Sequence, residues 1–336
     1  MKARSGLEVF IRLQTLCLVL FLSGLHSQEV RFEGNSQIRI GVMLEDSLSI
    51  EARQGAERAA KEINDNGGLR GREVELLFRS MEGPWGQGSK QAVDLIFDQE
   101  VWALVGSNQG RNAHLVEQVI AKTSVVFLSA WTADPTLAKA YVPHFFNCVS
   151  NSEQQAEAIL ADLLGRKGIT EWVLVSDPGY DSQKAVEGIS SRSSFQQNPP
   201  QEHLVCRSEA DLERVVKDID RLQARAAVIF CEPALAWQLI RLTRSKPNDM
   251  PLYGRLALLD EKASGPASED QLKQVYVPIN GHGGASGARA AYAYDAVRLL
   301  ADAIVRSGFD RGKLMAAVSE SVHDGMTGRI EFDALG

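Results

Sequence analysis

Cysteine and histidine are scarce in this sequence of 336 residues, which holds four of the first and six of the second. It has no Cys-x-x-Cys pair and no two histidines at helical spacing, so we expect no metal site. The glycine-rich phosphate motifs are also missing, and no Gly-x-Ser-x-Gly turn surrounds any serine. The sequence therefore predicts no cofactor and no enzyme, with a catalytic cleft as the alternative that turnover assays would test.

Long apolar runs are missing beyond the N-terminus. There, Lys2, Arg4 and Arg12 precede an apolar run from Leu13 to Leu22, and small residues follow it. This order is that of a secretory signal peptide, which we predict over residues 1–27. The run is shorter than the roughly 20 residues that span a bilayer. We therefore expect an exported, periplasmic protein without a transmembrane helix.

An excess of positive charge is missing as well, because the formal net charge is −7. Removal of residues 1–27 would take away three basic side chains and one acidic side chain, leaving about −9. A chain of this sign repels nucleic acid phosphates, so we expect no nucleic acid partner. The roughly 309 remaining residues exceed what one core usually holds and suit two lobes.

Short apolar segments alternate with segments whose apolar residues recur every three or four positions, which predicts alternating strands and helices. In the first half we expect strands at 38–43, 74–78, 102–105 and 125–128, with helices at 52–63, 92–97 and 113–121. In the second half we expect strands at 172–175, 204–205 and 226–230, with helices at 155–164, 212–222, 234–242 and 288–305.

Such alternation predicts mainly parallel sheets with helices on both faces, because parallel strands need crossover connections. The expected fold class is therefore α/β, with two doubly wound three-layer lobes and a cleft between them. We place the N-terminal lobe at 36–150 and the C-terminal lobe at 151–280. Residues 281–336 are expected to cross back towards the N-terminal lobe and the hinge.

Ligands of open α/β sheets bind beyond the carboxyl ends of the strands, where helix N-termini converge. That rule selects loops before any family is considered. The loops that follow the expected strands are 45–49, 106–112, 129–135, 176–182 and 231–233.

Several motifs appear in an order and at spacings that belong together. A motif that begins at Gly55, within the expected helix 52–63, ends in the turn 63–71, Ile-Asn-Asp-Asn-Gly-Gly-Leu-Arg-Gly, and segments 127–137, 291–297 and 327–333 follow. These motifs resemble the branched-chain amino acid (Leu/Ile/Val-binding) type of periplasmic binding protein that serves ABC importers. The resemblance implies a type I periplasmic binding protein fold, in which two lobes joined by three crossovers close over a ligand.

The resemblance also implies a ligand site. In that family a serine after the third strand and a loop after the fourth hold the carboxylate of an amino acid. These positions fall on Gly110 and on Trp131, Thr132 and Ala133, so the side chains have changed. An acid that receives the ammonium group would fall near Leu256, where this sequence has none.

Four further residues complete the predicted ligand site. Tyr180 matches a tyrosine motif of the family, and Asp46 belongs to the loop after the first strand. Arg111 is hypothesised to restore anion binding, because a guanidinium fork suits a carboxylate. Glu232 is hypothesised to contact a cation or a hydroxyl, and Trp131 to favour a planar or smaller ligand.

Each of these residues also has a purely structural interpretation. Trp131 could be a packing residue, and Arg111 a solvated loop residue. Glu232 precedes Pro233 and is typical of an acid at a helix N-terminus. Cys206 and Cys231 could form a disulfide or remain buried thiols.

The expected function is that of an extracytoplasmic solute-binding protein of an ABC-type importer, a monomer that delivers its ligand to a permease. The expected ligand is a small amino acid-like molecule, a carboxylate or an amide. The alternative is a periplasmic sensor or an accessory binding protein linked to a quinoprotein alcohol-oxidation system. The family normally continues beyond the segment that ends here at Phe332 and Asp333, so either the last crossover is abbreviated or the sequence is truncated.

Overall fold

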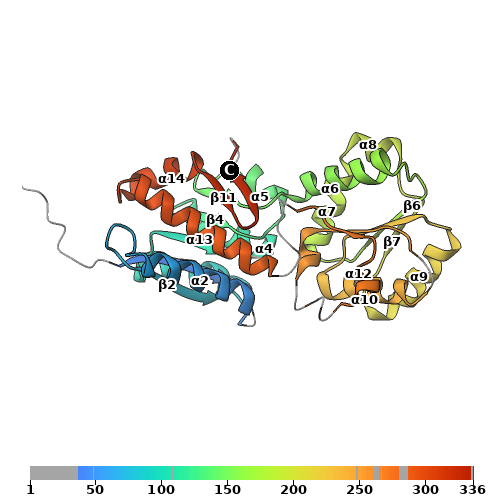
Figure 1. The fold of residues 1–336 in the computed structure, drawn as a ribbon, viewed down its shortest axis with the longest axis horizontal. Helices are drawn as coiled ribbons and strands as arrows, with labels where there is room; N and C mark the ends of the chain where they lie inside the picture. Colours follow the sequence, from blue (N-terminus) through green and yellow to red (C-terminus); the bar gives the residue numbers. More distant parts are fainter. Residues whose placement is uncertain are drawn as a thin grey trace, which may run out of the picture. The chain divides into compact units, whose positions relative to one another are not determined.

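The computed structural model describes residues 37–47, 49–106, 109–246, 249–260, 263, 265, 267–279, 287–333 and 336 (Figure 1). The predicted signal peptide, 1–27, and nearly all of the predicted loop 281–287 lie outside these residues. No helix in the described ranges combines the length and apolarity that crossing a membrane requires.

The first lobe is built on a parallel sheet in the order β2-β1-β3-β4-β5. Its strands are β1 (Ile38–Leu44), β2 (Val74–Ser80), β3 (Ala103–Gly106), β4 (Val126–Ser129) and β5 (Phe145–Asn147). Strands β3 and β4 are buried at every position, because helices cover both faces of the sheet.

In the described part of the chain, seven helices and a hairpin surround this sheet. One face packs against α2 (Ile50–Asp65), α13 (Ala288–Arg306) and α14 (Arg311–Ser319). The other packs against α3 (Gln87–Val93), η1 (Asp94–Asp98), α4 (Gly110–Ile120) and α5 (Pro135–Lys139). The antiparallel hairpin pairs β11 (Val322–Gly325) with β12 (Gly328–Glu331).

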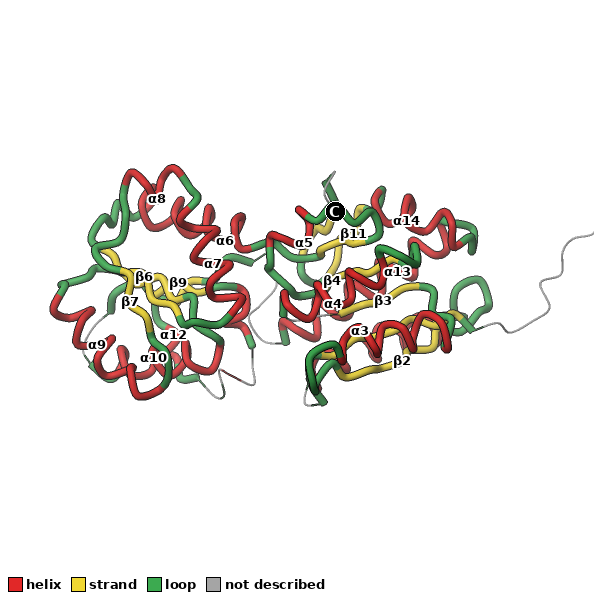
Figure 2. The backbone as a smooth tube through the Cα atoms, turned by 180° about the vertical axis from the view of Figure 1, so that it is seen from behind, coloured by secondary structure: helices red, strands yellow, loops and turns green. Residues whose placement is uncertain are grey.

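The second lobe also contains a parallel sheet, in the order β10-β9-β8-β6-β7. Figure 2 labels three of its strands, β6, β7 and β9. Its strands are β6 (Trp172–Ser176), β7 (His203–Val205), β8 (Ala226–Ile229), β9 (Leu252–Gly254) and β10 (Val275–Tyr276). Helices α6 (Ser152–Leu160), η2 (Ala161–Arg166), α7 (Tyr180–Ser190) and α8 (Ser193–Gln197) come first along the chain. Helices η3 (Glu209–Asp211), α9 (Leu212–Arg221), α10 (Pro233–Arg244), η4 (Leu256–Leu259) and α12 (Glu269–Leu272) follow.

The predicted α/β fold of two doubly wound lobes is confirmed. Two of the predicted loops were drawn too long, since α4 begins at Gly110 and α7 at Tyr180. Both helices start without a side-chain cap, after Gln109 and Gly179, so the sequence carries no capping signal at either start. Strands β5, β9 and β10, each only two or three residues long, were not predicted, although the equally short β7 was.

The three described cysteines, Cys148, Cys206 and Cys231, are buried free thiols. Of the two interpretations that the sequence left open for Cys206 and Cys231, the structure therefore shows the unbridged one. Burial raises the pKa of both thiols above that of an exposed cysteine, to about 11 for Cys206. Protonated, buried thiols are poor nucleophiles.

Helices α2 and α13 approach each other closely although more than 200 residues separate them. The buried face of α2 consists of small residues and one isoleucine: Gly55, Ala56, Ala59, Ala60 and Ile63. A Cβ atom built on Gly55 would lie 2.0 Å from the carbonyl oxygen of Ala290 on α13. The missing side chain at Gly55 is therefore what lets the two helices pack backbone to backbone.

We predict that Gly55→Ala lowers the free energy of unfolding by at least about 2 kcal/mol, because the helices must separate to admit the methyl group. Urea denaturation followed by circular dichroism measures the change. Gly165→Ala is the matched control, since a Cβ there meets nothing within 4 Å. If both variants unfolded like the wild type, the close approach of α2 and α13 would be incorrect.

Candidate functional site

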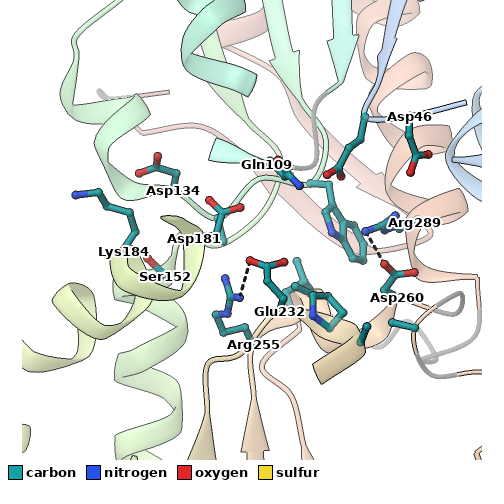
Figure 3. Close-up of a pocket in the computed structure, with 18 residues that line it drawn as sticks. Asp46, Gln109, Asp134, Ser152, Asp181, Lys184, Glu232, Arg255, Asp260 and Arg289 are labelled. Carbon is teal, nitrogen blue, oxygen red and sulfur yellow. Dashed lines mark ion pairs between the residues drawn. The ribbon is translucent and has the colours of Figure 1, made fainter. Parts of the chain in front are cut away.

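A cavity of about 340 Å³ is lined by residues from both lobes (Figure 3). The first lobe contributes residues that follow its strands: Glu45 and Asp46 after β1, Gln109 after β3, and Trp131, Ala133 and Asp134 after β4. The second lobe contributes Asp181 in the first turn of α7, Glu232 before α10, and Arg255 and Leu256 after β9. The cavity thus lies at the carboxyl ends of the strands, where the sequence placed it.

Several hydrogen bonds connect the lobes beside this cavity, including one from the backbone N–H of Ser152 to the carbonyl of Ala133 at 2.7 Å, and two of them are made by carboxylates. The backbone N–H of Gly110, at the start of α4, donates to Oδ1 of Asp181 at 3.1 Å. The hydroxyl of Tyr180 donates to Oδ2 of Asp134 at 3.0 Å. In both cases a carboxylate lies at a helix N-terminus, where unpaired N–H groups favour negative charge.

An apolar cluster adds to these contacts. It contains Trp131, Val149, Leu256, Ala288 and Tyr292, all buried. Trp131 meets Tyr292 edge to face, with ring centroids 5.1 Å apart, and the guanidinium of Arg289 lies 5.6 Å from the Trp131 ring. Trp131 therefore packs against the apolar cluster and also lines the cavity. Its packing role and a place in the predicted site are thus compatible.

Asp134 is the centre of a hydrogen-bonded network behind the cavity. It accepts from the backbone and hydroxyl of Thr136, and its Oδ2 lies 3.2 Å from Nε2 of His114. His114 also contacts Glu117 at 3.0 Å. Hydrogen bonds to Asp134 and then to Glu117 raise the pKa of His114 to about 9, so the imidazole is charged at neutral pH. Although burial opposes it, this network lowers the pKa of Asp134.

A second group of carboxylates lacks such support. Burial raises the pKa of Glu45 to about 7; Arg289 opposes the shift, whereas Asp46, Glu232 and Asp181 add to it. Burial likewise raises the pKa of Asp181 and of Glu232. Glu45 belongs to the first lobe and the other two to the second, so acids face each other across the cavity.

The cations of the cavity wall already have acidic partners. Arg289 forms an ion pair with Asp260 at 2.8 Å, and Arg255 lies 4.0 Å from Glu232, both marked in Figure 3. Lys184 pairs with Glu187 at 2.7 Å.

Four of the predicted ligand residues line the cavity: Asp46, Trp131, Ala133 and Glu232. The other four lie outside its lining. Gly110 uses its N–H for Asp181, and Thr132 is buried with its carbonyl accepting from Asn147. The Arg111 guanidinium lies over the rings of Trp85 and Tyr180, 5.7 and 5.6 Å from their centroids.

Sequence reasoning missed several residues of the wall. Glu45, Asp134 and Asp181 belong to loops that the strand-end rule had selected, so that rule was the signal for them. Ser152, Arg255 and Arg289 are brought in by α6, β9 and α13, and no local pattern marks them. Where the resembled family places an acid near Leu256, the cavity instead has Asp260, which is held by Arg289.

A model of the family described as periplasmic binding protein matches residues 38–245. The chain belongs to the periplasmic binding protein family. The predicted resemblance is thereby confirmed for this binding protein at the level of family and fold.

Solved structures share the fold of this binding protein at low sequence identity. The branched-chain amino acid transporter substrate binding protein LivJ from Streptococcus pneumoniae, in complex with isoleucine, has a TM-score of 0.74 and 19% identity, with 89% of this chain and 92% of that chain covered. An ABC transporter solute binding protein from R. palustris, in complex with benzoate, has a TM-score of 0.74 and 16% identity, with 89% and 90% covered.

One curated relative is glutamate receptor 3.4 of Arabidopsis thaliana, which is 28% identical over 158 residues. That match covers 46% of this chain and 16% of the receptor. The chain thus corresponds to a small part of the length of this relative.

We predict that His114→Gln lowers the free energy of unfolding by about 2 kcal/mol at pH 6 and by less at pH 9.5. The folded-state pKa of His114, about 9, lies above its ordinary value of 6.5. Its stabilisation is therefore complete below pH 6.5 and is lost as the pH rises through 9. Urea denaturation at both pH values measures the difference.

His144→Gln is the control, because burial lowers the pKa of His144 and should reverse the trend with pH. A loss of stability in His114→Gln that did not change between pH 6 and 9.5 would contradict the charged network.

Proposed function

We propose that this chain is an extracytoplasmic solute-binding protein of an ABC-type importer, which holds a small amino acid-like ligand between its two lobes. The observation that carries the proposal is the cavity lined jointly by both lobes at their strand ends. Pockets of a few hundred cubic ångströms enclose most of the surface of a small ligand. Membership of the periplasmic binding protein family supports the solute-binding role, and the relative in complex with isoleucine supports an amino acid-like ligand.

The proposed mechanism is differential stabilisation of a closed form. A ligand that contacts Asp46 or Trp131 on one lobe and Glu232 on the other interacts with both only when the lobes are together. Such a ligand shifts the population towards the closed form in proportion to its extra contacts there. The membrane permease is proposed to recognise that form, and no bond is made or broken.

A sensory role is the second candidate. The observation that favours it is the curated relative named as a glutamate receptor. In a sensor the same closing movement would report to a signalling partner instead of a permease. Uptake reconstituted in vesicles with candidate ABC permeases would separate the two roles, because only an importer component makes uptake dependent on the binding protein.

The proposal is tested by a thermal-shift screen of the mature protein against amino acids, short amides and carboxylates, including isoleucine and benzoate. A ligand that binds the folded state raises the melting temperature by mass action. Small-angle scattering with the strongest stabiliser should then show a smaller radius of gyration. A protein that no compound stabilises or compacts would contradict the proposed function.

We predict that Trp131→Phe abolishes the change in tryptophan fluorescence caused by the strongest stabiliser and weakens its affinity several-fold. Trp131 lines the cavity, whereas Trp102 packs against Phe309 and Arg311 away from it. Phenylalanine keeps an aromatic edge against Tyr292, so the fold is retained. Trp102→Phe is the matched control and should keep both the signal and the affinity. Loss of the signal in Trp102→Phe with no loss in Trp131→Phe would show that the ligand binds outside this cavity.

A further inference from the structure

The charges of the cavity wall do not balance. Six carboxylates line it, those of Glu45, Asp46, Asp134, Asp181, Glu232 and Asp260, against the three cations of Lys184, Arg255 and Arg289. Arg289 forms an ion pair with Asp260 at 2.8 Å. Lys184 forms an ion pair with Glu187, which is not part of the cavity wall. Asp134, Glu232 and Asp260 have a cation beside them, namely His114, Arg255 and Arg289, whereas Glu45 and Asp181 form no ion pair within the described residues.

Glu45 is the clearest case. Among the described residues it has neither a hydrogen bond nor an ion pair, and its pKa is raised by burial and by the acids around it. Asp181 has the N–H of Gly110, and Glu232 has Arg255 only at 4.0 Å. Figure 3 shows the carboxylates of Asp181 and Glu232 directed towards the same space from α7 and from the start of α10.

Two buried polar groups in the same wall also lack partners. The hydroxyl of Ser152, a residue only 3% exposed, makes no hydrogen bond within the described part of the chain. Nε of Arg255, a residue 6% exposed, has none either, although its Nη2 contacts Ser182 and the carbonyl of Cys231. Buried polar groups without partners are costly, so these two indicate a ligand that carries hydrogen-bonding atoms.

We propose that the ligand is an amino acid-like molecule with a net positive charge, whose cationic amine or guanidine group lies between Glu45, Asp181 and Glu232. This inference rests on the proposed function and narrows it. An oxygen acceptor at the other end of the ligand is placed to accept from Arg255 and Ser152. The cation would offset the repulsion between acids of opposite lobes, so that closing becomes favourable when the ligand is present and costly when it is absent.

The test uses three amino acids of similar length whose side chains end in a cation, a methyl group and a carboxylate: lysine, norleucine and 2-aminoadipate. Arginine, agmatine and 1,5-diaminopentane extend the cationic arm. Isothermal titration of the mature protein should give a Kd for the best cation at least tenfold lower than that for norleucine, and no binding of 2-aminoadipate. Raising the salt concentration should increase the Kd of the cation more than that of norleucine, because salt screens the attraction between charges.

The Glu45→Gln variant removes the unpartnered charge with little change in shape. It should raise the Kd of the best cation at least tenfold while leaving that of norleucine within twofold. Glu171→Gln is the matched control, since Glu171 is half exposed, pairs loosely with Arg225 at 3.7 Å and is not part of the cavity wall. It should change neither Kd.

The pH dependence gives an independent readout. The groups that act on Glu45 are Arg289, Asp46, Glu232 and Asp181. Its pKa of about 7 means that the carboxylate is only partly ionised at pH 6.5, and a bound cation would complete the ionisation. The affinity of the best cation should therefore rise between pH 6 and 8, and binding at pH 6.5 should release protons to the buffer. Both effects should be smaller in Glu45→Gln.

Tighter binding of norleucine or 2-aminoadipate than of any cation would overturn the charge assignment and leave the solute-binding proposal intact. Failure of all four cations to bind would also overturn it. An equal Kd in Glu45→Gln and wild type would remove the role of Glu45. The proposed function itself fails only if no compound of any charge stabilises or compacts the protein.

Discussion

The placement of carboxylates at the N-termini of helices is the constraint on which the rest of this site depends. The strand pairs of both sheets are parallel, and the helices that follow β4, β6 and β8 begin at the cavity wall, so their N-termini lie beside it. Asp134 caps α5, Asp181 lies in the first turn of α7 and Glu232 immediately precedes α10. The positive ends of these helices let the protein keep acids in a partly enclosed place without a matching number of cations.

The acids at these positions divide into two kinds. Asp134 has hydrogen bonds from Thr136 and Tyr180 and an imidazolium beside it, so it is a stable structural anion that joins α4, α5 and α7. Glu45 has none of these partners, and burial therefore raises its pKa. A buried carboxylate whose hydrogen bonds are all made is typical of a structural role. A carboxylate in a cavity that lacks such partners and has a shifted pKa is typical of a ligand-binding group.

The solved relatives with isoleucine and with benzoate show that one fold accepts chemically different ligands. This is expected when the two lobes supply the frame and the strand-end loops supply the contacts. Within this chain the frame consists of buried strands and of helix pairs such as α2 and α13, packed through Gly55.

The sequence by itself determined the alternation of strands and helices, and with it the two lobes and the strand ends at which the cavity lies, because both periodicities are local. It also selected the loops that hold Glu45, Asp134 and Asp181, although not these residues. Tertiary structure alone decided which side chains meet. Ser152 and Arg289 come from α6 and α13, and Arg255 directly follows β9, so these residues are far apart in the chain. Arg111 lies over Trp85 and Tyr180 instead of in the cavity. Helix starts without caps and three very short strands likewise depend on neighbours distant in sequence, which no local pattern encodes.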